Sequence, residues 1–167
     1  MKAISDSTPL IHLSEIGGLH YLKNLFDEVI ISRGVYEEVV SEGKKQIKNE
    51  VLPLEKFIEE KFIIVKEPKS IAKIERLDKG EKECISLCKE LDIDTILIDE
   101  KIGFNICSIF NLIPIRTTSI LIILLDKKII NLSKYKELLK RLPEKGYFLD
   151  ASTYQKLLNI GENIAKE

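Results

Sequence analysis

Two short apolar segments of this chain each end in an aspartate and run directly into a helical pattern. The first covers residues 2–6 and ends at Asp6; the second covers residues 95–99 and ends at Asp99. Strands that alternate with helices form parallel sheets, and right-handed crossovers bring the carboxyl ends of all the strands to one edge. Ligands bind at that edge in open α/β sheets. We therefore expect Asp6 and Asp99 to lie at the same ligand-binding edge.

The rest of the chain continues this alternation of strand and helix. With 167 residues, of which 44% are hydrophobic, it is long enough and apolar enough for one domain with a substantial core. We predict an α/β fold, a three-layer α/β/α sandwich with a parallel central sheet, as a single domain over residues 1–167 with a C-terminal helical extension over about 133–167. Further strands are predicted at 28–32, 62–65 and 113–117, and helices at 20–26, 35–40, 54–61, 81–91, 102–110, 119–129, 133–142 and 152–163, with a loop at Pro143–Leu149.

Capping residues mark where two of these helices begin. Ser7 and Thr8 can cap the first helix, and Pro9 suits its first turn, where no backbone N–H is needed. Asp78 is a predicted N-cap with Glu81 at the third helical position, which is the arrangement of a capping box. Glu81 has two readings: it caps the helix, or it presents a carboxylate to the site from the start of that helix.

The net charge of the chain does not indicate a nucleic-acid-binding surface. The net charge is −1, so there is no global basic field. The polar stretch at 43–50 is predicted to be a solvated face, with nucleic-acid binding through Lys44, Lys45 and Lys48 as the alternative.

Nothing in the chain predicts a membrane segment or a disulfide framework. The longest apolar run, residues 120–125, is far shorter than the roughly 20 residues that span a bilayer. An acid at Asp6 argues against a secretory signal, so we expect a cytoplasmic protein with no membrane partner. The three cysteines are then expected to be reduced thiols in the core: Cys84, Cys88 and Cys107.

Two glutamates join the two aspartates as candidate ligands. Val35 and Val39 are one helical turn apart and should face the core, so Glu38 is predicted to be drawn toward the sheet while Glu37 points outward. Several carboxylates in one pocket cannot all stay ionised without a counter-charge. Mg²⁺, or Mn²⁺ in its place, prefers oxygen ligands and can activate an attacking water. The candidate catalytic and metal-binding acids are therefore Asp6, Glu38, Glu81 and Asp99.

Five stretches, in this order and at this spacing, resemble the PIN domains, and among them the ribonucleases of the VapC type. They read DSTPLI, VYEEV, GEKECI, LIDE and LLNIGE, and they cover nearly the whole chain: Asp6–Ile11, Val35–Val39, Gly80–Ile85, Leu97–Glu100 and Leu157–Glu162. The resemblance implies a Mg²⁺- or Mn²⁺-dependent endoribonuclease that acts as the toxin of a toxin–antitoxin pair. It also implies an RNA substrate, a small antitoxin as partner and a homodimer.

The resemblance assigns a role to each acid of the quartet. Asp6 and Asp99 would hold the metal, directly or through water, and Glu81 would help to position it. Glu38 would orient or deprotonate the attacking water. Three hydroxyl side chains are the candidates for contact with a phosphate or a metal-bound water: Ser7, Thr117 and Ser119.

Two departures from the family pattern bear on substrate binding. A basic residue often follows the fourth acid, whereas residues 103–105 contain none. A glycine–threonine pair often precedes the next helix, whereas Arg116 and Thr117 stand here. The C-terminal helices carry several leucines that could form part of an antitoxin or dimer interface. We favour the alternative, that they pack on the chain's own core: Leu138, Leu139, Leu142, Leu157 and Leu158.

Two other functions remain open at this point. A catalytically impaired PIN-like module that binds RNA or protein fits the missing basic residue but leaves the clustered acids unexplained. A receiver-like phosphoacceptor domain also carries aspartates at strand ends, but it needs an acidic pair near the first strand, where only Asp6 stands.

Overall fold

A parallel sheet of five strands forms the centre of the molecule. The computed structural model describes residues 1–42 and 51–166, so Lys44, Lys45 and Lys48 lie outside the described residues. The strands are β1 (Lys2–Ser5), β2 (Glu28–Ser32), β3 (Ile63–Lys66), β4 (Thr95–Leu97) and β5 (Ile113–Ile115), and their order in the sheet is β3-β2-β1-β4-β5. All pairs are parallel, which confirms the predicted sheet.

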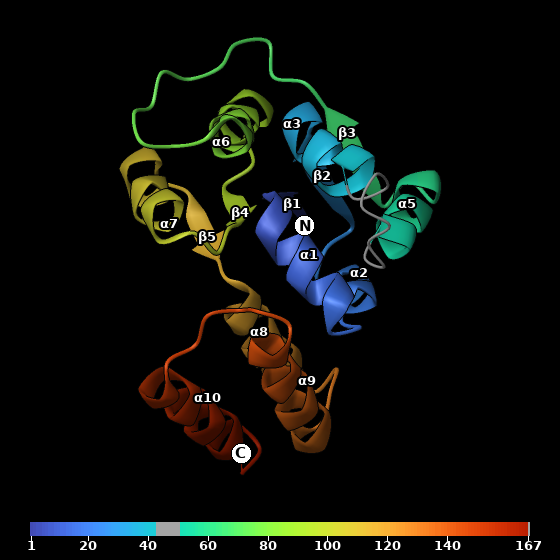
Figure 1. The fold of residues 1–167 in the computed structure, drawn as a ribbon, viewed down its shortest axis with the longest axis vertical. Helices are drawn as coiled ribbons and strands as arrows, with labels where there is room; N and C mark the ends of the chain where they lie inside the picture. Colours follow the sequence, from blue (N-terminus) through green and yellow to red (C-terminus); the bar gives the residue numbers. More distant parts are fainter. Residues whose placement is uncertain (43–50, 167) are drawn as a thin grey trace.

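Helices cover both faces of this sheet, which gives the predicted three layers. Figure 1 shows α6 (Lys79–Leu91) and α7 (Lys101–Cys107) on one side, and α1 (Ser7–Glu15), α2 (Leu22–Leu25) and α5 (Val51–Glu59) on the other. Short 3₁₀ turns η1 (Leu19–Tyr21) and η3 (Ser108–Phe110) adjoin α2 and α7. No helix within the described ranges is both long and apolar enough to cross a membrane.

The predicted helix at 35–40 has a more complex geometry. It consists of α3 (Arg33–Tyr36), capped by the hydroxyl of Ser32, and a π-helical turn η2 (Glu37–Glu42). The wider turn places both Val39 and Val40 in the core. π-Helical turns occur mostly as short pieces, and frequently at functional sites.

Three helices follow the sheet: α8 (Thr117–Asp126), α9 (Leu132–Glu144) and α10 (Ala151–Ile164). They pack on one another, and the loop between α9 and α10 passes over the start of α8 (Figure 1). The predicted loop at Pro143–Leu149 begins too early, because α9 continues through Pro143. Three buried leucines stabilise α9 as a helix: Leu138, Leu139 and Leu142. Together with the buried Leu157 and the half-buried Leu158 of α10, they pack on the core of this chain, as predicted.

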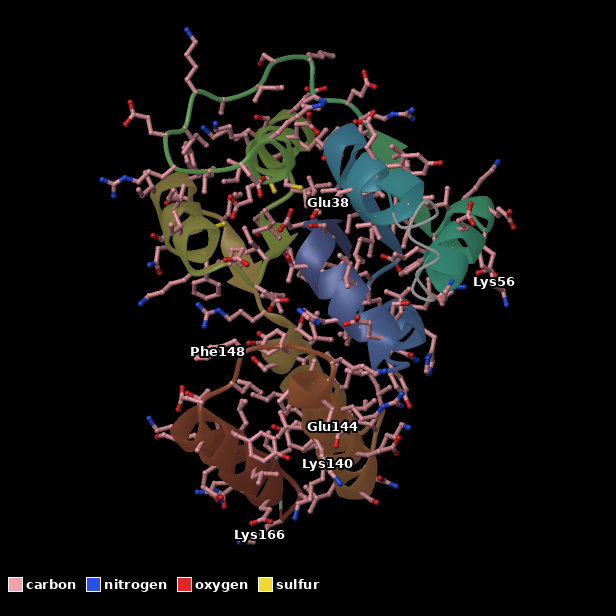
Figure 2. All side chains as sticks on the ribbon, in the orientation of Figure 1. Glu38, Lys56, Lys140, Glu144, Phe148 and Lys166 are labelled. Carbon is pink, nitrogen blue, oxygen red and sulfur yellow. The ribbon has the colours of Figure 1, made fainter. Side chains whose placement is uncertain are left out.

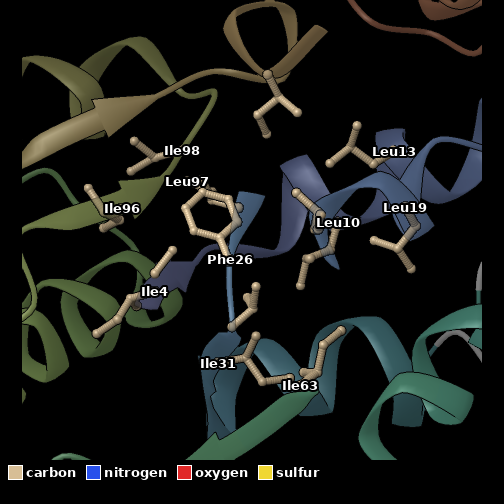
Figure 3. Packing of buried hydrophobic residues seen from close by; sticks show 14 of the residues in the cluster. Ile4, Leu10, Leu13, Leu19, Phe26, Ile31, Ile63, Ile96, Leu97 and Ile98 are labelled. Carbon is tan, nitrogen blue, oxygen red and sulfur yellow. The ribbon is translucent and has the colours of Figure 1, made fainter. Parts of the chain in front are cut away.

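The core lies between the sheet and its helices and is almost entirely aliphatic. Figure 3 shows strand residues such as Ile4 and Ile96 facing helix residues such as Leu10. All three cysteines are buried free thiols, as predicted. Because helices pack on both faces of the sheet, the carboxyl ends of its strands, and the polar residues that follow them, are held at defined positions.

Candidate active site

Asp6 follows β1 directly and is almost completely buried, with 4% of its surface exposed. Its backbone N–H donates to the carbonyl of Leu97 at the end of β4, 2.9 Å away, so the ends of the two strands are joined at this point. Asp6 is also the N-cap residue of α1. The prediction that Ser7 or Thr8 caps this helix was therefore wrong: both lie in its first turn, where Ser7 is buried.

Burial raises the pKa of Asp6 from its ordinary value of 3.8 to about 7. The backbone N–H of Ser7 opposes this shift, while the charges of Asp78, Glu81 and Glu38 add to it. A buried carboxylate that is repelled by three others lacks the counter-charge that would keep it ionised. We call these four residues the Asp6 cluster.

Glu81 caps α6, as predicted, and its carboxylate is also buried at the start of that helix. It forms a capping box with Asp78: the Asp78 carboxylate accepts from the Glu81 N–H at 2.8 Å, and Glu81 accepts from the Asp78 N–H at 3.0 Å. It is also buried, and desolvation followed by the charges of Asp78 and Glu100 raises its pKa. A Cβ on Gly103 would lie 2.5 Å from Glu81 Oε1, so the glycine makes room for this carboxylate.

Glu38 belongs to the Asp6 cluster but comes from the π-helical turn η2, whereas Glu81 comes from α6. It lies between α3 and α6, near the start of α1 (Figure 2), and it is exposed rather than drawn in. Glu37 is exposed too and pairs with Arg33 at 3.3 Å. Buried Glu83 accepts a hydrogen bond from the Gly34 N–H at 2.8 Å, so α6 holds the segment that carries Glu38 in place.

Asp99 is held by residues from outside the sheet. Its carboxylate accepts from the backbone N–H of Thr117 at 2.9 Å and from the Thr117 hydroxyl at 2.7 Å. The Tyr147 hydroxyl, from the α9–α10 loop, donates to the same carboxylate at 2.9 Å. Thr117 therefore orients Asp99 and has its hydroxyl engaged, while Ser119, two residues further into α8, is half-buried.

A cleft of about 570 Å³ opens beside Asp99, and we call it the Asp99 cleft. Two basic side chains line it, Lys101 and Arg116, although residues 103–105 carry none. Both lie outside residues 103–105, the stretch in which the family pattern led us to expect a basic residue. The remaining lining residues come from α1, the N-cap of α7, α8, the α9–α10 loop and the first turn of α10: Thr8, His12, Glu100, Thr118, Gly146, Tyr147, Phe148, Leu149, Asp150 and Thr153.

The structure therefore brings two of the other three predicted acids, Glu38 and Glu81, close to Asp6, and Asp78 with them. Asp99 follows the neighbouring strand at the same sheet edge, but its oxygens are bound by Thr117 and Tyr147. Within residues 1–42 and 51–166, no three His, Cys, Asp or Glu side chains are arranged to hold an ion. The possible ligand atoms of the Asp6 cluster are nevertheless all carboxylate oxygens, and they lack a counter-charge. The chemistry of these residues therefore fits a hard divalent cation.

Several residues at this edge were not predicted from sequence. Asp78 was predicted only as a cap, although its spacing from Glu81 already places it beside the site. Glu83 belongs to the GEKECI stretch, two residues after Glu81. Tyr147 has no local signal, because its partner Asp99 lies 48 residues earlier in the chain. Only packing of the C-terminal helices brings these two together.

Two of three comparisons with known proteins found a match, and both agree with this architecture. A family model described as DUF3368: PIN domain matches residues 2–162. A solved structure of a PilT N-terminus domain protein from the hyperthermophilic archaeon Sulfolobus solfataricus P2 aligns over 72% of this chain and 90% of its own, at 20% identity and a TM-score of 0.53. None of the curated proteins compared with the chain matches it. The structural likeness supports the fold alone.

Proposed function

We propose that this chain, which belongs to the DUF3368 family of PIN domains, is a divalent-metal-dependent endoribonuclease. The PIN domain is a nuclease-type fold, and nucleases of this kind hydrolyse phosphodiester bonds. The observation that carries the proposal is the environment of Asp6: a buried carboxylate with a pKa raised to about 7, repelled by three further carboxylates at the carboxyl edge of a parallel sheet. Such a cluster is stabilised by a cation.

Mg²⁺ or Mn²⁺ is the proposed cofactor. Asp6 and Glu81 would hold it from the Asp6 cluster, and Asp99 would reach it directly or through water. When bound, the ion neutralises the carboxylates and stabilises negative charge on the phosphodiester. Thr117 and Tyr147 fix the orientation of Asp99, as outer hydrogen bonds commonly do for metal-ligating carboxylates.

Glu38 is the proposed acceptor of the proton from the attacking water. It is exposed while Asp6 and Glu81 are buried, so it is the predicted acid that solvent reaches most readily. In hydrolysis, the water oxygen bonds to phosphorus, a water proton passes to Glu38, and the bond from phosphorus to the leaving oxygen breaks.

Incubation with total cellular RNA and Mg²⁺ or Mn²⁺, with mapping of the new 5′ ends, tests the activity. Asp6→Asn and Asp99→Asn should abolish the cleavage, while Asp126→Asn, a change at an exposed aspartate of α8, should not. Cleavage that persists in both Asn variants would come from a contaminant and would overturn the proposal.

The proposed biological role is the toxin of a toxin–antitoxin pair, acting as a cytoplasmic homodimer that a small antitoxin protein holds inactive. Three exposed isoleucines on α7, η3 and the edge strand β5 support self-association: Ile102, Ile109 and Ile113. Sedimentation should give a dimer, and Ile109→Lys should shift it to monomer. A small reading frame next to the gene, whose product forms a complex with this chain, would support the antitoxin.

The alternative is a module that binds RNA or protein without cutting. One observation favours it: both Asp99 oxygens are already hydrogen-bonded, so Asp99 is not free to bind an ion without exchange of partners. Calorimetry with Mn²⁺ separates the two functions. Binding at millimolar Mn²⁺ that is lost in Asp6→Asn supports the nuclease, and its absence in the wild-type protein supports the binding module.

A further inference from the structure

We infer that the Asp99 cleft receives an unpaired nucleotide of single-stranded RNA, whose base stacks on Phe148 and whose phosphate pairs with Arg116 and Lys101. The choice of RNA rests on the proposed function. The placement of the nucleotide rests on the cleft itself, which is lined by an exposed aromatic ring and by two basic side chains.

Phe148 is the most exposed of the large hydrophobic residues described in this structure, with 89% of its surface exposed. Figure 2 shows it on the loop between α9 and α10, at the side of the molecule. The residue also lines the Asp99 cleft. Exposed aromatic rings beside a positively charged groove are a recurring platform for the bases of single-stranded nucleic acids.

The loop that carries Phe148 is anchored on both sides of this residue. On one side, Tyr147 donates its hydroxyl to Asp99 and stands edge-on to the ring of His12, with 5.0 Å between the centroids. On the other side, Asp150 caps α10 by accepting from the N–H of Thr153 at 2.8 Å and from its hydroxyl at 2.7 Å. The backbone that carries the ring is therefore anchored, so that little loop entropy is lost when a base stacks on the ring.

Arg116 is the second element of the proposed site. Its guanidinium lies 4.3 Å from the centroid of the Phe104 ring. Its Nε is buried and has no hydrogen-bond partner among the residues that the structure describes. A buried N–H without a partner is costly, and an arginine fixed against an aromatic ring is well suited to bind an anion. Lys101 lines the same cleft and is exposed.

The cleft also contains three carboxylates, and two of them are engaged. Asp99 is bound by Thr117 and Tyr147, and Asp150 is bound by Thr153. Glu100 is exposed and lies next to Lys101 in the sequence. The hydrogen bonds to Asp99 and Asp150 come from neutral groups and leave both carboxylates charged, so a phosphate would be held by direct pairing with Arg116 and Lys101 rather than by the net charge of the cleft.

Single-stranded RNA fits this arrangement better than a duplex. A base within a duplex is stacked on both faces and cannot offer one to Phe148, whereas an unpaired base can. Stacking of this kind tolerates any base, so we expect affinity for unpaired RNA with little dependence on sequence.

Binding of a 5′-labelled single-stranded oligoribonucleotide, followed by fluorescence anisotropy in a chelating buffer, tests the inference without cleavage. Phe148→Ala should weaken binding about 5- to 150-fold, because stacking contributes about 1–3 kcal/mol per base. Phe148→Trp should retain the wild-type affinity. Ile71→Ala removes an apolar side chain that is 49% exposed and does not line the cleft, and should have no effect.

Arg116→Gln should weaken binding at low salt and make the affinity less dependent on salt concentration, because one fewer phosphate is neutralised. Equal affinity of the wild-type protein and Phe148→Ala, or equal binding of single-stranded and duplex RNA, would overturn the inference. Cleavage is scored separately. If Asp6→Asn leaves cleavage intact while Phe148→Ala weakens binding, the nuclease proposal fails and the nucleotide site stands; the converse result rejects only the nucleotide site.

Discussion

The Tyr147 hydroxyl donates a hydrogen bond to Oδ1 of Asp99 across 48 residues of sequence, at 2.9 Å. The bond joins the loop between α9 and α10 to the carboxyl edge of the central sheet. Burial, together with the charge of Asp99, raises the pKa of the Tyr147 phenol, so the hydroxyl remains a donor at neutral pH. The C-terminal helices are thereby part of the candidate active site.

Removal of this hydrogen bond by Tyr147→Phe should lower RNA cleavage about tenfold, because outer hydrogen bonds to metal-ligating groups contribute about 10- to 100-fold in affinity or activity. The loss should be partly recovered at higher Mn²⁺ concentration. Tyr21→Phe, a change at a half-buried tyrosine of η1, is the matched control. Identical metal-concentration dependence in the two variants would show that Tyr147 does not position Asp99.

The raised pKa of Asp6 predicts how stability varies with pH in a chelating buffer. Below 3.8 the group is protonated in both the folded and unfolded states, and above about 7 it is ionised in both. Between these values the folded state binds more protons, so the free energy of unfolding falls as pH rises, by up to about 4 kcal/mol.

Asp6→Asn should therefore be more stable than the wild-type protein at pH 8 in a chelating buffer, by up to a few kcal/mol. Near pH 4 this advantage should be much smaller. Urea unfolding at both pH values measures the difference, with Asp126→Asn as the control. Added Mg²⁺ should stabilise the wild-type protein more than Asp6→Asn, because the neutral amide oxygen is a weaker ligand for the ion than the carboxylate. A pH-independent difference would contradict the burial of a charged Asp6.

The two roles of Glu81 can be separated by two substitutions. Glu81→Gln keeps an oxygen that accepts from the Asp78 N–H, so the helix cap and the stability should be nearly unchanged while cleavage is lost. Asp78→Ala removes the N-cap and should cost about 1 kcal/mol in the free energy of unfolding. Full activity in a well-folded Glu81→Gln protein would assign Glu81 to the cap alone.

Close packing at Gly161 predicts a stability effect opposite to helix propensity. A Cβ at this position would lie 2.4 Å from Cε1 of Tyr135, whose ring is fully buried and whose hydroxyl donates to the Leu157 carbonyl. Gly161→Ala should therefore destabilise the protein by about 1–3 kcal/mol, although alanine normally favours a helix by about 1 kcal/mol. Gly18→Ala meets only ordinary contacts of 3.5 Å or more and is the control in urea unfolding.

Much of the fold could be predicted from short-range patterns. The strand β2 is a continuous apolar run, and β1 and β4 are apolar segments followed by acids, so the sheet and the edge at which the acids stand followed from the sequence. The capping box of Asp78 and Glu81 was predicted because all of its hydrogen bonds form within one helical turn. The geometry around Glu38 was not, since no local sequence pattern marks a π-helical turn.

The sequence by itself determined which carboxylates stand at the carboxyl edge of the sheet, because strand alternation and crossover handedness depend on local sequence and chain chirality. Only the tertiary structure decided how those acids are paired. Asp6 is buried among three other acids, whereas Asp99 is bound by Thr117 and Tyr147. The physical reason is that the pKa and the hydrogen-bond partners of a carboxylate depend on groups close in space, and the helices that supply them are brought there by hydrophobic packing far along the chain.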